Sequence, residues 1–145
     1  MTPLRVRTLL VVALCAACAQ HSDLPGEYRL VAVDGKPLPA TGWDDACQVV
    51  GGGGLTLQAN AKWQAFLVTR DSCGGAFDTS RFMGRWAAKD SAVTLPVDSF
   101  FQVGAFGSGA STGDSLFGEA KGGGLTLRHG LLQRTVLLLR RQDAR

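Results

Sequence analysis

The feature that most constrains the fold is an alternation of apolar and polar residues with a period of two, which runs through the chain after its first 24 residues. The clearest example is Ser80–Trp86, in which Phe82 and Trp86 share one face of an extended strand and two arginines share the other. No stretch places apolar residues at the spacings i, i+3, i+4 and i+7 that an amphipathic helix requires. The pattern therefore predicts antiparallel strands with one buried face and one solvated face.

Further short alternating runs are separated by glycine, Asn-Ala and Asp-Ser turns. About eight strands within about 120 residues are typical of a single antiparallel up-and-down β-barrel, whose closure leaves no exposed strand edge. We therefore expect one all-β barrel domain over residues 25–141. Besides Ser80–Trp86, the expected strands are Glu27–Asp34, Cys47–Val50, Gly54–Ala59, Lys62–Arg70, Ala92–Val97, Ser115–Lys121, Leu125–Arg128 and Thr135–Arg140.

The hexapeptide Gly-Gly-Gly-Leu-Thr-Leu occurs twice, at residues 52–57 and 122–127. Neither copy carries the Lys-Ser/Thr of a phosphate-binding loop or leads into a predicted helix. The glycines are therefore interpreted as turn or bulge residues at the corners of the barrel. Each copy then directs its two leucines to one face of a strand and its threonine to the other.

Residues 1–19 have the layout of a secretory signal peptide, with Arg5 and Arg7 ahead of a short apolar run and small residues. The apolar run is too short to span a bilayer as a helix, which needs about 20 residues. The signal peptide can end in two ways. Either Cys18 is lipidated, in a segment that resembles a bacterial lipobox, or the chain is cleaved before Gln20. A buried first helix is the remaining alternative. The expected location is the bacterial periplasm or, as a lipoprotein, the outer membrane, and otherwise the secreted medium.

Two cysteines, Cys47 and Cys73, remain in the body of the chain. Export to an oxidising compartment favours a disulfide between them. A metal or redox pair lacks support, because there is no C-x-x-C motif and neither His21 nor His129 lies near either cysteine in the sequence.

The charge pattern argues against nucleic acid as a partner. Without Arg5 and Arg7 the chain carries thirteen basic and twelve acidic residues, so its remaining surface is nearly neutral overall. The basic residues are scattered singly, without an aromatic platform for bases.

The sequence also predicts neither an enzyme nor a metal or cofactor site. There is no G-x-S-x-G motif, and His129 is expected in a hairpin turn. The adjacent carboxyl groups of Asp44 and Asp45 are expected in a solvated loop, and no residues show metal-ligand spacing.

Aromatic residues remain as candidates for binding. Trp63, Phe66, Phe82 and Trp86 lie on the two central predicted strands. Phe82 and Trp86 share a face, but Trp63 and Phe66 cannot both join them unless the strand contains a bulge. A barrel of about eight strands is either filled by side chains or holds one small ligand, so these residues form either the core or the wall of an apolar pocket.

A possible lid follows in Ser99–Gly113, which has too little periodicity to define a strand and forms the longest expected connection. Its Phe100, Phe101 and Phe106 either tuck onto the barrel from a flexible loop or cover its open end.

Several short segments follow one another in a characteristic order. They are Gly26–Pro39, Leu55–Asn60, Thr69–Arg70 before Cys73, Gly84–Trp86, Val93–Leu95 and Leu137–Arg140. This order is similar to that of a group of small exported bacterial proteins with a lipocalin-like fold, part of the broad calycin set. The resemblance covers about 115 residues and consists of turn and strand patterns rather than chemical signatures. It implies a small barrel that binds a hydrophobic molecule.

We therefore expect a monomeric, exported binding module for a small hydrophobic ligand, attached to a membrane only through an N-terminal lipid. The alternative is a protein–protein interaction module, such as a periplasmic inhibitor of a secreted hydrolase, for which small barrel lipoproteins that inhibit lysozyme are the precedent. An apolar cavity larger than about 300 Å³ would favour the ligand, and a filled barrel would favour the protein partner.

Overall fold

The computed structural model describes residues 23–41, 47–71, 73–103, 108–109, 114–129 and 135–142. The regular structure of these residues is entirely antiparallel β-strand, which confirms the all-β prediction. The strands are β1 (Gly26–Val33), β2 (Lys36–Pro37), β3 (Ala40–Thr41), β4 (Gln48–Leu57), β5 (Lys62–Asp71), β6 (Phe77–Arg85), β7 (Ala87–Lys89), β8 (Ala92–Pro96), β9 (Ser99–Val103), β10 (Ser108–Gly109), β11 (Ser115–Lys121), β12 (Gly124–His129) and β13 (Val136–Arg141).

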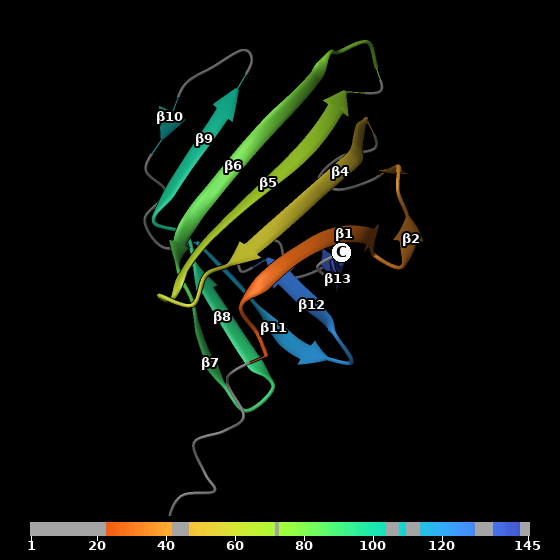
Figure 1. Cartoon of the computed structure of the whole chain (residues 1–145). Helices are drawn as coiled ribbons and strands as arrows, with labels where there is room; N and C mark the ends of the chain where they lie inside the picture. Colours follow the sequence, from red (N-terminus) through yellow and green to blue (C-terminus); the bar gives the residue numbers. More distant parts are fainter. Residues whose placement is uncertain are drawn as a thin grey trace, which may run out of the picture.

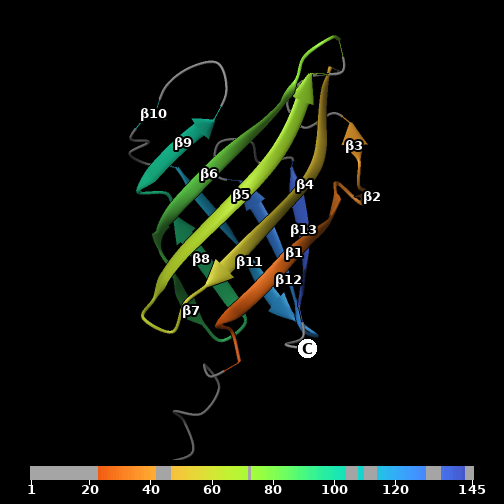
Figure 2. The same cartoon turned by 45° about the horizontal axis from the view of Figure 1, so that its top comes forward.

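The strands form one strongly curved, barrel-like sheet. Its order is β10-β9-β6-β5-β4-β1-β13-β12-β11-β8-β7, with β2 beside β1 and β3 beside β4. In Figures 1 and 2 the strands from β9 to β1 make the front wall, while β11, β12 and β8 pass behind them. The curvature encloses the apolar core between the two walls.

The first long strand and the last strand are neighbours. Tyr28 in β1 lies opposite Leu55 of β4 on one side and opposite Arg141 of β13 on the other. The side chain of Arg141 also donates hydrogen bonds to the carbonyl oxygens of Asp23, at 2.5 Å, and Pro25, at 3.0 Å. The two ends of the described chain are thereby held together.

A long bent hairpin formed by β6 to β9 connects the two ends of the strand order, β9-β6 at its beginning and β8-β7 at its end. β7 pairs with β8, and β6, which precedes β7 by one residue, pairs with β9, which follows β8 by two. Between the two ladders the amide of Asp98 donates to the carbonyl oxygen of Met83 at 2.9 Å. β6 and β7 together therefore run beside β8 and β9 together.

The predicted alternation places the core. Leu55 and Leu57 in β4, and Leu125 and Leu127 in β12, are buried, whereas the threonine between each pair is not. Both copies of the Leu-Thr-Leu sequence thus turn their leucines inward. Burying a leucine side chain contributes roughly 1.5–3 kcal/mol, so the four leucines are a substantial part of the stability.

The first glycine run is not a turn, which corrects the predicted division of this region into two strands. Cys47–Val50 and Gly54–Ala59 belong mostly to the single strand β4, which passes straight through Gly51–Gly54. The register shifts between Val50 and Gly52, so the expectation of a bulge is met inside the strand. The second run does form a turn, because Gly122 and Gly123 have φ values of 59° and 75°.

The segment after Ser99 begins as a strand rather than as the irregular connection that was expected. β9 pairs with β6 over five residues, with Phe100 opposite Phe82 and Phe101 opposite Arg81. Two consecutive phenylalanines, one on each face, hide the period of two from the sequence. The partner strand β6 supplies the order that the segment's own composition does not show.

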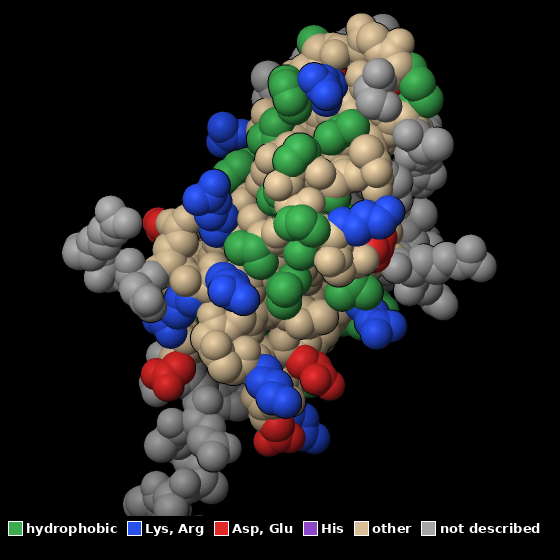
Figure 3. Space-filling view, turned by 90° about the vertical axis from the view of Figure 1, so that its right-hand side faces the viewer, with side chains coloured by type: hydrophobic (Ala, Val, Ile, Leu, Met, Phe, Trp, Pro, Cys, Tyr) green, Lys and Arg blue, Asp and Glu red, His purple; other side chains and the backbone are tan. Residues whose placement is uncertain are grey.

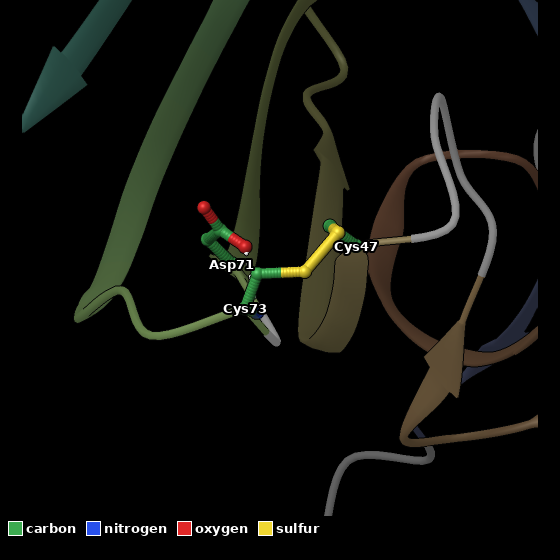
Figure 4. Close-up of a disulfide and its surroundings, with 3 residues drawn as sticks. All are labelled: Cys47, Asp71 and Cys73. Carbon is green, nitrogen blue, oxygen red and sulfur yellow. Dashed lines mark hydrogen bonds between the residues drawn. A yellow bond between two sulfur atoms is a disulfide. The ribbon is translucent and has the colours of Figure 1, made fainter.

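The predicted disulfide is present. Cys47 and Cys73 are bonded with their Cα atoms 5.6 Å apart, so that the start of β4 is tied to the β5–β6 turn. Figure 4 shows Asp71 beside this bond, where its Oδ1 accepts a hydrogen bond of 2.8 Å from the amide of Cys73.

Candidate functional site: the apolar interior and its two ends

The inner face of the central strands brings together three of the four aromatic residues that the sequence singled out. In β5 the odd-numbered residues face inward, and in β6 the even-numbered residues do, since Trp63 lies opposite Gly84 and Ala65 opposite Phe82. Trp86 continues the inward series of β6, and both Phe82 and Trp86 pack against the core. Phe66 has the opposite parity.

Trp63 and Trp86 close the interior at the end where the β4–β5 turn lies. Trp63 is only 1% exposed and donates its indole N–H to the carbonyl oxygen of Pro96 at 3.0 Å. The indole N–H of Trp86 donates to the carbonyl oxygen of Gln58, also at 3.0 Å, and its amide donates to Ala61. Both polar groups are satisfied by backbone, as a buried tryptophan requires. These contacts make the two residues structural at this end.

A small cavity of about 50 Å³ lies inside the sheet, which we call the inner cavity. Its wall consists entirely of apolar residues and glycines drawn from seven strands and from Val97. Neither Trp63 nor Trp86 borders it. Among the wall residues are Leu30, Leu55, Ala65, Phe82, Leu127 and Leu139. The cavity is well below the volume of about 300 Å³ that is typical of a ligand pocket.

Phe66 faces the opposite way from the other predicted wall residues, which corrects its expected place in the barrel interior. Its side chain is 47% exposed and its ring lies against the outer side of Gly54, where an added Cβ would come within 2.7 Å of the ring. Phe66 still borders the inner cavity, beside Gly53 and Gly54, where the wall has no side chains of its own. The alternation of β5 makes this outward orientation unavoidable once Trp63 faces inward.

The interior becomes polar toward the end that carries the disulfide. From Leu67 onward three inward residues of β5 and β6 are polar and half-buried: Ser80 lies directly opposite Leu67, and Thr69 lies directly opposite Asp78. An apolar middle with polar groups at one end is the arrangement that orients an amphipathic ligand. These three residues were not predicted from the sequence, although the alternation of Phe82 and Trp86, extended backwards, reaches Ser80 and Asp78.

Phe82 is the wall residue with an aromatic partner. Its ring centroid lies 5.1 Å from that of Phe100 at an interplanar angle of 45°, and Phe100 is half-buried in β9. Phe101 is 41% exposed on the outer face. Phe106, the third residue of the expected lid, lies outside the described residues, as do Cys18, Asp44 and Asp45.

One cluster of three side chains that could ligate a metal lies in the part of the chain that the structure describes. The one described cluster is Cys47, Asp71 and Cys73, whose sulfur atoms are already joined to each other and are therefore not free thiolates. Burial raises the pKa of Tyr28 above its ordinary value of 10.0; the positive charge of Arg141 lowers it and the negative charge of Asp23 raises it further. The Tyr28 hydroxyl donates to the carbonyl oxygen of Leu24 at 2.7 Å.

The outer surface of the sheet carries exposed hydrophobic side chains as well as charged ones. Figure 3 shows the side on which β1, β2 and β13 lie, where hydrophobic side chains gather between Lys and Arg side chains and the acidic ones lie mainly toward the lower end. Phe117 in β11 and Leu138 in β13 are more than one-third exposed.

Comparison of the chain with protein-family models, with curated proteins and with solved structures gives no significant match. Among the described residues there is no helix of the length and apolarity needed to cross a membrane. The indications of function therefore lie in the interior and on the outer surface of the sheet.

Proposed function

We propose that this protein is an exported, lipocalin-like binding module. The proposal treats β6 with β7, and β8 with β9, as two bent strands, so that eight strands follow one another around a closed up-and-down barrel. It is supported by the pairing of β1 with both β4 and β13, and by the hydrogen bond from Asp98 to Met83 that links the two halves of the long hairpin.

The proposed ligand is a small hydrophobic molecule with a polar group at one end. The observation that carries this proposal is the inner cavity, whose entirely apolar wall adjoins the polar inward positions of Thr69, Asp78 and Ser80. Apolar cavities in proteins stay dry and take up apolar molecules. The apolar part of the ligand would lie against Phe82 and the leucines, and its polar part toward Asp78.

The volume of the inner cavity sets a condition on this function. At about 50 Å³ the cavity is smaller than the roughly 150 Å³ of an apolar cavity that admits benzene. A ligand larger than a few carbon atoms would therefore enter only when Phe82 and Phe100 separate. In this proposal the two rings act as the movable part of the wall, while Trp63 and Trp86 stay in place and report binding by their fluorescence.

Titration of a fluorescent fatty acid against the chain from Gln20 onward, which keeps every described residue, tests the proposal. We expect saturable quenching of tryptophan emission. Ala65→Leu, which places a larger side chain in the cavity wall, should weaken this binding at least tenfold. Ala92→Leu is the matched control, because Ala92 is exposed at the start of β8.

Two outcomes would overturn the ligand proposal: no saturable quenching at high micromolar ligand, or equal binding by Ala65→Leu and the unaltered chain. Circular dichroism of both variants is needed to show that each remains folded. A loss of structure in Ala65→Leu would move the test to Leu127→Ala, which enlarges the same cavity and should strengthen binding.

The second candidate is a protein–protein interaction module, such as an inhibitor of a secreted hydrolase. The observation that favours it is the small volume of the inner cavity together with the exposed phenylalanines on the outer face. Inhibition of a secreted hydrolase such as lysozyme, without fatty-acid binding, would support this candidate over the first. Neither function needs a catalytic residue, a metal or a cofactor.

The proposed location is the bacterial cell envelope. It is supported by the signal-like residues 1–19 and by the disulfide, which forms most readily in an oxidising compartment. Lipidation of Cys18 would attach the domain to the outer membrane.

A further inference from the structure

The outward residues of the two central strands form a surface without any acidic side chain, which we call the β5–β6 outer face. It carries four basic residues, four large apolar residues and two neutral polar ones. All ten are described, and eight of them are exposed. They are Lys62, Gln64, Phe66, Val68 and Arg70 of β5, and Phe77, Thr79, Arg81, Met83 and Arg85 of β6.

The basic side chains on this face lie beside each other or beside aromatic rings. Lys62 is directly opposite Arg85, although like charges opposite each other on neighbouring strands are destabilising. Arg70 lies over the ring of Phe77, with its Cζ atom 5.1 Å from the ring centroid. The four basic side chains of this face therefore have no compensating carboxylate on the same face. An anionic partner would relieve the repulsion between Lys62 and Arg85.

The apolar side chains of the same face are unusually exposed. Phe66, Phe77 and Met83 are 47%, 58% and 38% exposed, and Phe101 of the adjacent strand β9 lies next to Arg81 with 41% exposure. Among the described residues these are four of the six large hydrophobic side chains that are exposed to this degree. Clustered exposed apolar residues mark a surface that docks onto something.

We propose that the β5–β6 outer face docks onto a lipid bilayer that contains anionic phospholipids. Its arginines and lysine would contact the phosphate groups, and its phenylalanines and Met83 would enter the boundary between head groups and acyl chains. Surfaces that combine basic and large apolar side chains bind such membranes through electrostatic attraction to the anionic lipids and through burial of apolar surface.

The position of the chain's N-terminal end favours a bilayer over an acidic protein. Gly26, at the start of β1, lies opposite Leu57 of β4, and Leu57 lies opposite Trp63 of β5. The start of β1 is therefore level with the end of β5 that carries Lys62. Cys18 precedes Asp23 by five residues, which span at most about 18 Å when extended. This argument rests on the lipid anchor of the proposed function: with Cys18 acylated, the bilayer would lie within reach of the end of the β5–β6 outer face that carries Lys62 and Arg85.

The experiment uses the chain from Gln20 onward, which has no acyl chain, and measures co-flotation with vesicles. One set of vesicles is pure phosphatidylcholine, and the other contains 30% phosphatidylglycerol. We expect binding to the anionic vesicles only, and a fall in binding as salt is added. The double variant Phe66→Ser, Arg81→Ser should reduce the partition coefficient at least tenfold.

A matched control exists on the outer face of the opposite wall, which β11 and β12 form. Phe117 in β11 lies directly opposite Arg128 in β12, as Phe66 lies opposite Arg81, but Glu119 shares its face. The double variant Phe117→Ser, Arg128→Ser should bind the anionic vesicles within twofold of the unaltered chain. All four side chains are exposed, and circular dichroism checks that both double variants are folded.

The proposal is overturned if the chain does not float with anionic vesicles, or if both double variants lose binding equally. Binding to polyglutamate but not to vesicles would assign the face to an acidic protein and would also overturn it. Ala65→Leu separates this proposal from the ligand in the barrel, because it should weaken fatty-acid binding at least tenfold and leave vesicle binding unchanged.

Discussion

The indole N–H of Trp63 in β5 donates a hydrogen bond of 3.0 Å to the carbonyl oxygen of Pro96 in β8, although β6 lies between the two strands. The contact passes over Gly84, which lies opposite Trp63 in β6 and has no side chain to obstruct it. A Cβ added at Gly84 would collide with the same carbonyl oxygen and lie 2.9 Å from Trp63 Nε1. One partly buried hydrogen bond thus joins the front wall of the sheet to the strand that passes behind it, and one glycine permits the close approach that this bond needs.

Gly84→Ala is therefore expected to destabilise the protein by at least about 2 kcal/mol, because the backbone oxygen that it meets cannot rotate away. Gly52→Ala is the matched variant, since it also lies in a strand but has no atom within 4 Å of its added Cβ. Its effect should stay within about 1 kcal/mol. Urea unfolding followed by circular dichroism measures both, and equal losses would contradict the close approach at Gly84.

Trp63→Phe is expected to lower the free energy of unfolding by about 2 kcal/mol, because it leaves the Pro96 carbonyl without this donor and removes buried ring area. Trp86→Phe removes an equivalent hydrogen bond to Gln58 from a half-buried residue and should cost less. Chemical denaturation compares the two. The reverse order would show that Trp86, and not Trp63, fixes this end of the interior.

Replacing both Cys47 and Cys73 by alanine is expected to cost about 3 kcal/mol, because the unfolded chain loses the constraint of a loop that spans 26 residues. Dithiothreitol should lower the free energy of unfolding of the unaltered chain by a similar amount and leave that of the double variant unchanged. An unaltered chain that does not respond to reduction would argue against a disulfide in the folded protein.

The stability should also decrease at high pH because of Tyr28. Burial raises its pKa above 10.0 in the folded state, so the folded protein holds the phenolic proton more tightly than the unfolded chain does. The resulting contribution is complete below pH 10 and is lost as the pH rises through the folded value. Tyr28→Phe should show a smaller fall in stability above pH 10.

The titration itself can be followed directly, since Tyr28 is the single tyrosine of the chain. Absorbance at the phenolate wavelength should give a midpoint above 10 in the folded protein and a lower one in urea. Coincident midpoints would mean that the hydroxyl is not buried.

For the N-terminus, Cys18→Ser should abolish incorporation of a labelled fatty acid in a bacterial host. Cys47→Ser is the control that should leave labelling intact. Labelling that persists in Cys18→Ser would exclude this residue as the site of lipidation and, with it, the proposed anchor.

The strands that the sequence predicted best are those that alternate between the core and solvent. β5 and β6 follow their predicted alternation, which places Trp63, Phe82 and Trp86 on one face and Phe66 on the other. Such strands can be predicted from the sequence because a single buried face imposes an apolar–polar alternation with a period of two.

The errors occurred where the neighbouring strand, and not the sequence of the segment, decides the structure. Gly51–Gly54 has no side chains that could show a period, yet its ladder with β5 keeps it extended. Ser99–Val103 has phenylalanine on both faces, and its pairing with β6 makes it a strand. Local composition is a poor guide at both places because tertiary pairing overrides it.

The inner cavity was beyond the reach of the sequence for a different reason. Its volume depends on how closely side chains from seven strands meet, and the sequence alone does not give those distances. The β5–β6 outer face, in contrast, follows from the alternation once β5 and β6 are paired. The scattered basic residues of the sequence, Lys62 and Arg85 among them, become a cluster only in that register.

The pairing of β1 with β13 means that the sheet stays incomplete until its last described long strand has joined it. Until β13 is in place, the edges of β1 and β12 that it covers stay open. An open edge of this kind accepts any strand of suitable length and pattern, including the β13 of a second copy. A chain shortened before Val136 would leave a six-residue gap between β1 and β12, into which a supplied peptide with the sequence of β13 should insert.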